Sequence, residues 1–329
     1  MTDVTIVVPS VKADALLRRC IAECRAQAPG AEIIVLLDES EGSEVLSDDP
    51  EIIITGPVTI AAKRNRGAYA STANYLAFID SDAYPDKGWP ETGIALLRRS
   101  LDIAIVGGPD LPWPEETGWA RLIGRASRSP LISAKSAYRK YRARSRDCPH
   151  LPSCNMIVRR HDYLRLGGMK EDLETGEDLE YCYRVRAEDG RIVYMPDVAV
   201  FHRDRDLGPF FVQRLVYGAS IWRLIQNGLS LSNFYLFVPG LAVLFFASAP
   251  LILAYPNYGT LQALAAVSLA IILCIEAIRT AGRTADVPGL FAILGVGLLA
   301  PGIGTILGGL GLLPEVKAIY RNSPTKKIY

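Results

Sequence analysis

The sequence predicts an α/β fold, a mostly parallel doubly wound sheet, followed by a C-terminal region of transmembrane-type helices. In the first two hundred residues, apolar β-branched runs alternate with amphipathic segments, as they do in parallel sheets covered by helices on both faces. Half of the 329 residues are hydrophobic, and the apolar excess lies almost wholly beyond residue 233. We therefore expect an α/β domain over residues 1–225 and a membrane domain over residues 226–329.

The N-terminal elements alternate between strand and helix. Residues 4–10 and 31–40 are apolar runs that end in polar residues, and each predicts a buried strand. Residues 14–27 lie between them and carry their apolar side chains on one helical stripe, which predicts a helix. The same reasoning predicts a strand, a helix and a second strand over residues 51–55, 59–72 and 75–79.

The elements that follow are less regular. Residues 102–109 predict a further strand, whereas residues 113–150 are irregular and basic, with no acid between positions 125 and 146. This basic stretch is either a solvated surface or a contact with phosphate headgroups of a membrane. Downstream we expect a strand, turn and short helix, then a longer helix, then a pair of strands, over residues 152–169, 175–190 and 191–202.

Three C-terminal segments are each long and apolar enough to span about 30 Å of hydrocarbon. They cover residues 234–254, 260–278 and 288–313, and Glu276 is the one charged residue among them. A core helix of a soluble protein could explain one such segment, but it explains three in succession poorly. We therefore expect a multi-pass protein of the plasma (inner) membrane.

The charges around these segments indicate their orientation. Loop 255–259 is uncharged and residues 279–286 contain two arginines, which predicts a cytoplasmic second loop and a cytoplasmic first domain. The C-terminal tail is also basic, through Lys317, Arg321, Lys326 and Lys327. The third segment therefore either spans fully or forms a re-entrant hairpin around Pro301.

Composition and cysteine spacing exclude several classes of function. A net charge of +1 predicts no nucleic-acid partner. The six cysteines form no CxxC pair and no zinc spacing, and Cys20 and Cys24 lie one helical turn apart on an apolar face, as core residues do. Cys148 and Cys154 could form a disulfide, although nothing else indicates an oxidising compartment. The first residues predict a strand rather than a signal peptide.

Carboxylates follow two of the predicted strands where each strand ends. Asp38 ends one strand, and Asp80 and Asp82 follow another. Ligands of such sheets bind beyond the carboxyl ends of the strands. Carboxylate oxygens are the ligands that Mg²⁺ or Mn²⁺ prefers when it shares its shell with substrate phosphates, although Asp-rich turns are also common without a metal. His202 ends a later strand and is a further candidate ligand.

Six motifs resemble, in order, the family 2 glycosyltransferases of the membrane-anchored, non-processive bacterial type. They run through about the first two hundred residues and read VTIVVPS, LLDES, AAKRNRGAYAS, FIDSDAYPD, CNMIVRR to LEYCYRV, and VAVFH. The resemblance implies the GT-A nucleotide-diphospho-sugar transferase fold. It also implies metal-dependent, inverting transfer of a sugar from a UDP-, GDP- or dTDP-sugar.

The resemblance also assigns roles to single residues. Mn²⁺ or Mg²⁺ would be held by Asp82 and His202, with Asp80 divided between the metal and the ribose. Asp178 would be the general base, with Glu177 beside it; the alternative is that both acids only favour a helix N-terminus. The residues implied in binding the donor nucleotide are Pro9, Ser10, Asp38, Lys63, Arg64, Asn65 and Asp80.

The residues after the base indicate the type of acceptor. Gln213 and Arg214 are adjacent and no Arg-Trp pair follows, unlike the Gln-x-x-Arg-Trp motif of processive members, so we expect one sugar per encounter. The resemblance implies that Arg205, Arg214 and Tyr217 bind the phosphate of a polyprenyl-phosphate or polyprenyl-diphosphate acceptor in cell-envelope glycan or glycolipid synthesis. A plain juxtamembrane basic segment is the alternative.

Two other functions fit parts of the sequence. A nucleotidyltransferase shares the sheet and the acidic site but needs a glycine-rich basic loop after the first strand, where this chain has one lysine and no glycine. A non-enzymatic membrane scaffold or lipid-transport subunit could retain an inactive transferase domain. Such a domain would have no reason to keep Asp80, Asp82, Asp178 and His202 together.

Overall fold

The structure is a computed structural model that describes residues 3–42, 46, 50–173, 175–227, 231–253 and 255–322. The described chain divides into two compact units, each discontinuous in sequence. Unit 1 is built from the chain up to Pro114 and from Tyr138–Arg203, and unit 2 from Glu115–Ala137 and the residues after Arg203. This division differs from the single boundary expected after residue 225.

An eight-stranded sheet forms the centre of unit 1. Its strand order is β3-β2-β1-β4-β9-β6-β10-β8. The strands are β1 (Val4–Pro9), β2 (Glu32–Leu37), β3 (Glu51–Ile54), β4 (Tyr75–Ile79), β6 (Ile103–Gly107), β8 (Arg146–Asp147), β9 (Asn155–Arg159) and β10 (Arg191–Tyr194). The pairs among β1 to β4 are parallel, as predicted, but β9 runs antiparallel to both β4 and β6, and β8 antiparallel to β10. The sheet is therefore mostly parallel with two reversed strands.

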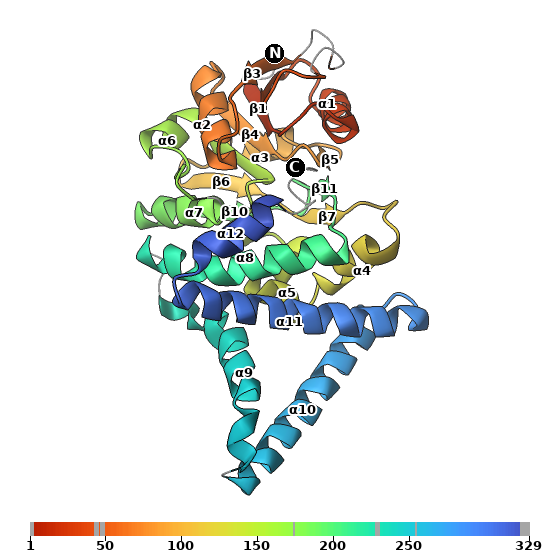
Figure 1. Ribbon diagram of the computed structural model, residues 1–329. Helices are drawn as coiled ribbons and strands as arrows, with labels where there is room; N and C mark the ends of the chain where they lie inside the picture. The colour runs from red at the N-terminus through yellow and green to blue at the C-terminus, as the bar shows by residue number, and fades with distance from the viewer. Residues whose placement is uncertain are drawn as a thin grey trace. The chain divides into compact units, whose positions relative to one another are not determined.

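Helices cover both faces of this sheet. The helices are α1 (Ala15–Gln27), α2 (Ile60–Ala70), α3 (Glu91–Arg99), α6 (Arg160–Arg165) and α7 (Glu177–Ala187). In β1, Ile6 and Val8 pack in the same buried cluster as α1, whereas Val7 packs in the cluster that holds α2 residues. In Figure 1, α1 and α2 accordingly lie on opposite sides of β1. This two-sided burial confirms the doubly wound architecture and explains the near-continuous apolar strands.

A second, three-stranded sheet completes unit 1, in the order β5-β11-β7. It contains β5 (Ala83–Pro85), β7 (Asp110–Pro112) and β11 (Val200–His202). Strand β11 runs antiparallel to β5, with His202 opposite Ala83. This register brings the histidine at the end of β11 next to the acidic turn that follows β4.

Unit 2 is helical throughout its described residues. Its elements are α4 (Gly118–Ala126), α5 (Pro130–Ser133), α8 (Leu207–Gln226), η3 (Leu231–Phe237), α9 (Val238–Ala247), η4 (Ala249–Leu253), α10 (Pro256–Thr280), η5 (Thr284–Asp286), α11 (Val287–Gly309) and α12 (Leu313–Asn322); η2 (Ala134–Lys140) joins the two units in sequence. Two helical stretches, Asn257–Thr280 and Thr284–Gly309, are long and apolar enough to cross a membrane, judged by length and composition.

The structure shows how regular the first and third of the expected apolar segments are. The first is broken into η3, α9 and η4, so its longest regular helix has 10 residues. The third forms one continuous helix through Pro301, and a hairpin at that proline is therefore absent (Figure 1). Lys326 and Lys327 of the basic tail, and the side chains of Lys317 and Arg321, lie outside the described residues.

Helices α8 and α11 cross at a distance that only glycine allows. A Cβ atom at Gly304 would meet the carbonyl oxygen of Leu215, and one at Gly218 would meet that of Pro301. Half of the most apolar window of α11 is buried in this packing, compared with 17% for α10. Thus α11 is an internal helix of unit 2, whereas α10 presents most of its apolar surface outward.

The crossing can be tested with two glycines of the same helix. Gly304→Ala should lower the free energy of unfolding by about 1–3 kcal/mol, because the added methyl group overpacks a backbone contact. Gly295→Ala is the matched control: its Cβ would meet no atom within 4 Å, and its better helix propensity should stabilise by up to about 1 kcal/mol. Thermal unfolding in detergent measures both, and equal midpoints for the two variants would contradict this packing.

Candidate active site

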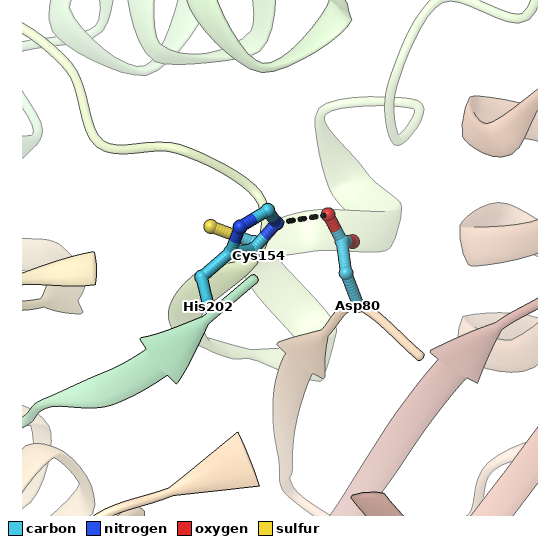
Figure 2. A group of neighbouring side chains, drawn as sticks. All are labelled: Asp80, Cys154 and His202. Carbon is cyan, nitrogen blue, oxygen red and sulfur yellow. Dashed lines mark ion pairs between the residues drawn. The ribbon is translucent and has the colours of Figure 1, made fainter. Parts of the chain in front are cut away.

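Strand register brings three potential ligands together in unit 1. Asp80 follows β4 directly and Cys154 precedes β9, and the antiparallel pairing of Ile79 with Asn155 makes them cross-strand neighbours. His202 is the last residue of β11. One ligand atom from each of Asp80, Cys154 and His202 lies within 4.8 Å of the other two, and Figure 2 shows the three side chains converging.

The two acids of the turn after β4 both approach the histidine. His202 Nε2 lies 3.7 Å from Asp80 Oδ2 and 3.5 Å from Asp82 Oδ1. Asp82 is buried, with 1% of its surface exposed, and a buried carboxylate requires a compensating positive charge. Two carboxylates and one imidazole on fixed strand ends fit a divalent cation, which supplies that charge. Asp80, Asp82 and His202 are the residues that would hold it.

Protonation in the absence of a metal follows the same electrostatics. Burial opposes ionisation of Asp80, but Arg64 and His202 outweigh it and lower the pKa of Asp80 to about 2. Burial likewise opposes the charged form of His202, but Asp82 and Asp80 outweigh it and raise the pKa of His202 to about 9. At neutral pH the imidazolium therefore occupies the place of a cation between two carboxylates.

Arg64 connects this cluster to the N-terminus of α7. Its guanidinium is 1% exposed and donates through one nitrogen to Asp80 Oδ1 at 2.7 Å and through another to Glu177 Oε1 at 2.9 Å. Burial alone would lower the pKa of Arg64, but the two carboxylates raise it. Arg64 was expected to contact the donor nucleotide, and in the structure its two terminal nitrogens are engaged by protein carboxylates.

The two acids at the start of α7 have different surroundings. Glu177 is buried, and burial together with the charge of Asp178 raises the pKa of Glu177 to about 7 despite the ion pair with Arg64. Asp178 is half-buried and accepts hydrogen bonds from the main-chain N–H groups of Ser153 at 3.2 Å and Leu179 at 2.7 Å. The accessible carboxylate of the pair is therefore Asp178, and its position is fixed by main-chain donors.

Three further expected nucleotide ligands, Pro9, Ser10 and Asp38, lie at the ends of β1 and β2, and Lys63 of α2 contacts two of them. Lys63 is buried, forms an ion pair with Asp38 and donates to the carbonyl oxygen of Ser10. Pro9 and Ser10 are themselves buried at the end of β1.

Asn65, another expected nucleotide ligand, uses its amide for internal contacts. Its nitrogen donates to Met169 O and Glu171 Oε1, and its oxygen accepts from the Tyr163 hydroxyl and Met169 N. Asn65 thus ties α2 to the segment that precedes α7.

Sequence reasoning missed two features of this site. Cys154 was considered only as a disulfide partner of Cys148, but both are free thiols in the structure. The basic stretch 125–146 was expected to be either solvated or in contact with headgroups, but Lys140 forms an ion pair with buried Asp110 in unit 1. The reversed direction of β9 and the ion pair between Lys140 and Asp110 both depend on residues far apart in the sequence, so no local sequence pattern indicates them.

The expected acceptor residues Arg205, Arg214 and Tyr217 all belong to unit 2. Arg214 lies on α8 and its guanidinium donates weakly to the carbonyl oxygen of Gly297 at 3.4 Å. The hydroxyl of Tyr217 accepts a hydrogen bond from Gln213 at 3.0 Å.

Comparison with known proteins identifies the class to which this chain is similar. Residues 5–167 match the family model described as Glycosyl transferase family 2. Two curated proteins from two strains of Mycobacterium tuberculosis, both named pre-mycofactocin glycosyltransferase, are 27% identical over 241 residues. The match covers 66% of this chain and 46% of each relative, so the chain spans about half the length of these relatives.

A solved structure extends the similarity to the fold. A mannosyltransferase from Pyrobaculum calidifontis, solved in complex with GDP-Man and Mn²⁺, aligns with a TM-score of 0.56 and 17% identity. The alignment covers 92% of this chain and 87% of that chain. It confirms the predicted GT-A fold.

The pKa of Glu177 predicts how stability depends on pH. Because the pKa is raised to about 7 in the folded protein, above about 4.3 in an unfolded chain, the folded state binds more protons between these values. The free energy of unfolding should therefore fall between about pH 4 and about pH 7, with Glu177 contributing on the order of 3 kcal/mol.

The variant Glu177→Gln cannot lose this proton, so its stability should fall less over the same range, whatever its absolute value. Thermal unfolding across the pH series measures the slope. Glu188→Gln, at an exposed position, is the control and should keep the wild-type slope. Parallel profiles for wild type and Glu177→Gln would contradict the raised pKa.

Proposed function

The chain belongs, over residues 5–167, to glycosyl transferase family 2, and from this premise we propose that it is a membrane-bound, metal-dependent, inverting glycosyltransferase. It transfers one sugar from a nucleotide-sugar donor to a lipid-linked acceptor. The observation that carries the proposal is the pairing, in one unit, of a cation site with a positioned carboxylate base. Arg64 contacts Asp80 on one side and Glu177, next to the base, on the other.

Each half of the site has a separate task in the transfer. Asp178, held by the N–H groups of Ser153 and Leu179, accepts the proton of the acceptor hydroxyl as that oxygen attacks the anomeric carbon. Asp82, His202 and Asp80 would hold a Mn²⁺ or Mg²⁺ ion, which would supply positive charge to the departing nucleoside diphosphate. With one base and no enzyme nucleophile, a single displacement inverts the anomeric carbon.

The donor is a UDP-, GDP- or dTDP-sugar. The ends of β1 and β2 present Ser10 and Asp38, and Lys63 holds both in place for contacts with the nucleoside. The mannosyltransferase with the similar fold was solved with GDP-Man and Mn²⁺, which supports a nucleotide-diphospho-sugar and a divalent cation here.

Arg214 supports an acceptor that carries a phosphate. Burial lowers its pKa, and Tyr217 is the one described neighbour that offsets this effect. Arg214 is half-buried, and its Nε is buried without a hydrogen-bond partner among the described residues. Such a guanidinium without a described carboxylate partner is costly, and a phosphate of a polyprenyl phosphate or diphosphate would compensate it. Arg205 and Tyr217 are the further residues of this acceptor site. The curated relatives act, by their name, on pre-mycofactocin, which is therefore the competing acceptor in any assay.

The apolar segments support attachment by a two-helix hairpin. Helix α10 is about 37 Å long at 1.5 Å per residue, and η3, α9 and η4 together reach about 39 Å, so either arm can cross the hydrocarbon. The arms meet at the tip, where Gln262 donates to the carbonyl oxygen of Phe245, and they diverge toward α11 (Figure 1). Exposed apolar side chains occur along both arms, including Leu241, Leu244, Leu264, Ile271 and Ile275.

The partners of α11 support a position of this helix at the membrane surface. Along its length α11 packs on α8 and α4, which carry Arg214 and Arg223, and Arg121 and Arg125. Moving each arginine to the bilayer centre with α11 would cost about 3 kcal/mol or more. The chain would thus cross the plasma membrane twice, through α9 and α10, and both ends of unit 2 and the active site would lie in the cytoplasm.

The transferase proposal is tested with purified full-length protein, Mn²⁺, and UDP-, GDP- and dTDP-sugars. We expect sugar transfer to polyprenyl phosphate with one donor. Asp178→Asn should reduce the rate at least about a hundredfold while nucleotide and Mn²⁺ still bind, because only proton transfer is lost. Asp82→Ala should abolish both Mn²⁺ binding and transfer.

Asp197→Asn, at an exposed turn, is the control and should remain fully active. Full activity of Asp82→Ala would contradict the metal assignment. Transfer to a soluble acceptor alone would contradict the lipid assignment.

The hairpin proposal is tested by the labelling of single cysteines. Native Cys274 is the one exposed cysteine and lies on α10, so in vesicles it should react with a membrane-impermeant maleimide only after detergent is added. In a Cys274→Ser background, Arg283→Cys and Leu312→Cys flank α11 and should react from the same side of the membrane. Asn257→Cys, at the tip, should react from the opposite side.

Labelling of positions 283 and 312 from opposite sides would mean that α11 spans. Labelling of all positions from one side, with release of the protein by alkaline carbonate, would contradict membrane insertion altogether.

A further inference from the structure

The cation cluster of unit 1 contains a sulfur ligand that the proposed transferase chemistry does not use. Figure 2 shows Cys154 beside the Asp80–His202 pair, and one ligand atom of each residue lies within 4.8 Å of the others. All three residues stand at strand ends, beside β4, β9 and β11, so their positions are set by main-chain hydrogen bonding. The side chain of Asn155, which follows Cys154, is itself fixed by donating to the carbonyl oxygens of Pro109 and Val198.

The Cys154 thiol lacks the main-chain acceptor that three of the other four buried thiols have, and the fourth, Cys24, is paired with the Cys20 thiol. Those of Cys20, Cys148 and Cys182 each donate to a main-chain carbonyl oxygen. Over the part of the chain that the structure describes, Cys154 makes no such hydrogen bond, although it is only 7% exposed. A buried sulfur without an acceptor, next to a carboxylate and an imidazole, is the arrangement of a metal ligand rather than of a core residue.

The chemistry of these ligands separates two classes of cation. Thiolate with imidazole and carboxylate suits Zn²⁺ and its heavier analogue Cd²⁺, and three protein ligands leave a position open for water or substrate. Mn²⁺ and Mg²⁺ prefer oxygen and gain little from sulfur. Asp80 and His202 could serve either class of cation. Asp82 would be the third ligand of Mn²⁺ or Mg²⁺, and Cys154 would be the third ligand of Zn²⁺ or Cd²⁺.

We propose that Asp80, Cys154 and His202 form a binding site for a thiophilic divalent cation, Zn²⁺ or Cd²⁺, which competes with the activating Mn²⁺ or Mg²⁺. The proposal rests on the role of Asp80 and His202 in the proposed function and adds a residue to it. Binding forms a bond between Cys154 Sγ and the metal and releases the thiol proton to solvent. Zn²⁺ held in this way occupies the ligands that the activating cation needs, so it is an inhibitor of transfer.

The test uses direct metal binding, so that it does not depend on activity. The reduced full-length chain carries Cys274→Ser, because Cys274 is the one exposed thiol. Cd²⁺ should produce the ultraviolet sulfur-to-metal charge-transfer absorption with one equivalent. Adding Cys154→Ser should abolish this absorption, whereas adding Cys148→Ser, the matched buried control, should leave it unchanged.

Competition measured by the electron paramagnetic resonance of Mn²⁺ gives the second readout. Zn²⁺ should displace Mn²⁺ at a concentration more than about tenfold lower when Cys154 is present, since even outer-shell partners of a metal are worth tenfold or more. Mn²⁺ affinity itself should be the same with and without Cys154. Cys154→Ala serves as a second variant if Cys154→Ser lowers the thermal unfolding midpoint.

Three outcomes decide the matter. Unchanged Cd²⁺ absorption in Cys154→Ser, or equal Zn²⁺ competition in both proteins, overturns the proposal. Absence of Zn²⁺ and Cd²⁺ binding while Mn²⁺ binds overturns it as well and leaves the proposed transferase site intact. Absorption that depends on Cys154 in a protein that fails to bind Mn²⁺ supports the soft-metal site and contradicts the activating-metal site instead.

Discussion

The arrangement of the candidate active site depends on one buried cation, Arg64. Taking a guanidinium out of water is costly, and the structure offsets the cost with two carboxylates, Asp80 and Glu177, that would otherwise repel each other. The three residues come from α2, from the end of β4 and from the start of α7. Their mutual attraction therefore fixes the distance between the cation site and Asp178, which no continuous element of secondary structure spans.

The ends of strands position the potential metal ligands. The turn after β4, the start of β9 and the end of β11 carry the potential metal ligands, and hydrogen bonding of the sheets sets their register. A site built in this way needs little side-chain reorganisation to receive a charged ligand, because its groups are already held by neighbouring strands. The protonated imidazole of His202 lies between the two acids and offsets their mutual repulsion.

Much of the fold and several residues of the candidate site were predictable from the sequence. The features that were not predictable have physical causes. Strand and helix order followed from apolar periodicity, and Asp38, Asp80, Asp82 and His202 were candidates because each stands where a strand ends. The direction of β9 was not predictable, because the apolar pattern of a strand buried on both faces is the same for parallel and antiparallel pairing. Cys154 lies beside Asp80 only because β9 is antiparallel to β4, so its place in the cluster was missed. The internal role of Asn65 was missed because its partners lie about a hundred residues further along the chain.

The discontinuity of unit 2 has a consequence for how the chain is made. Arg121 of α4 is paired with Asp286, which lies 165 residues later, and Ile123 packs in the same cluster as Leu290 and Ile293. The ribosome must therefore synthesise most of the protein before the apolar face of α4 can meet α11. Until then that face is exposed on a nascent chain whose α/β half is otherwise complete, and a fragment that ends at Arg203 would keep it exposed permanently.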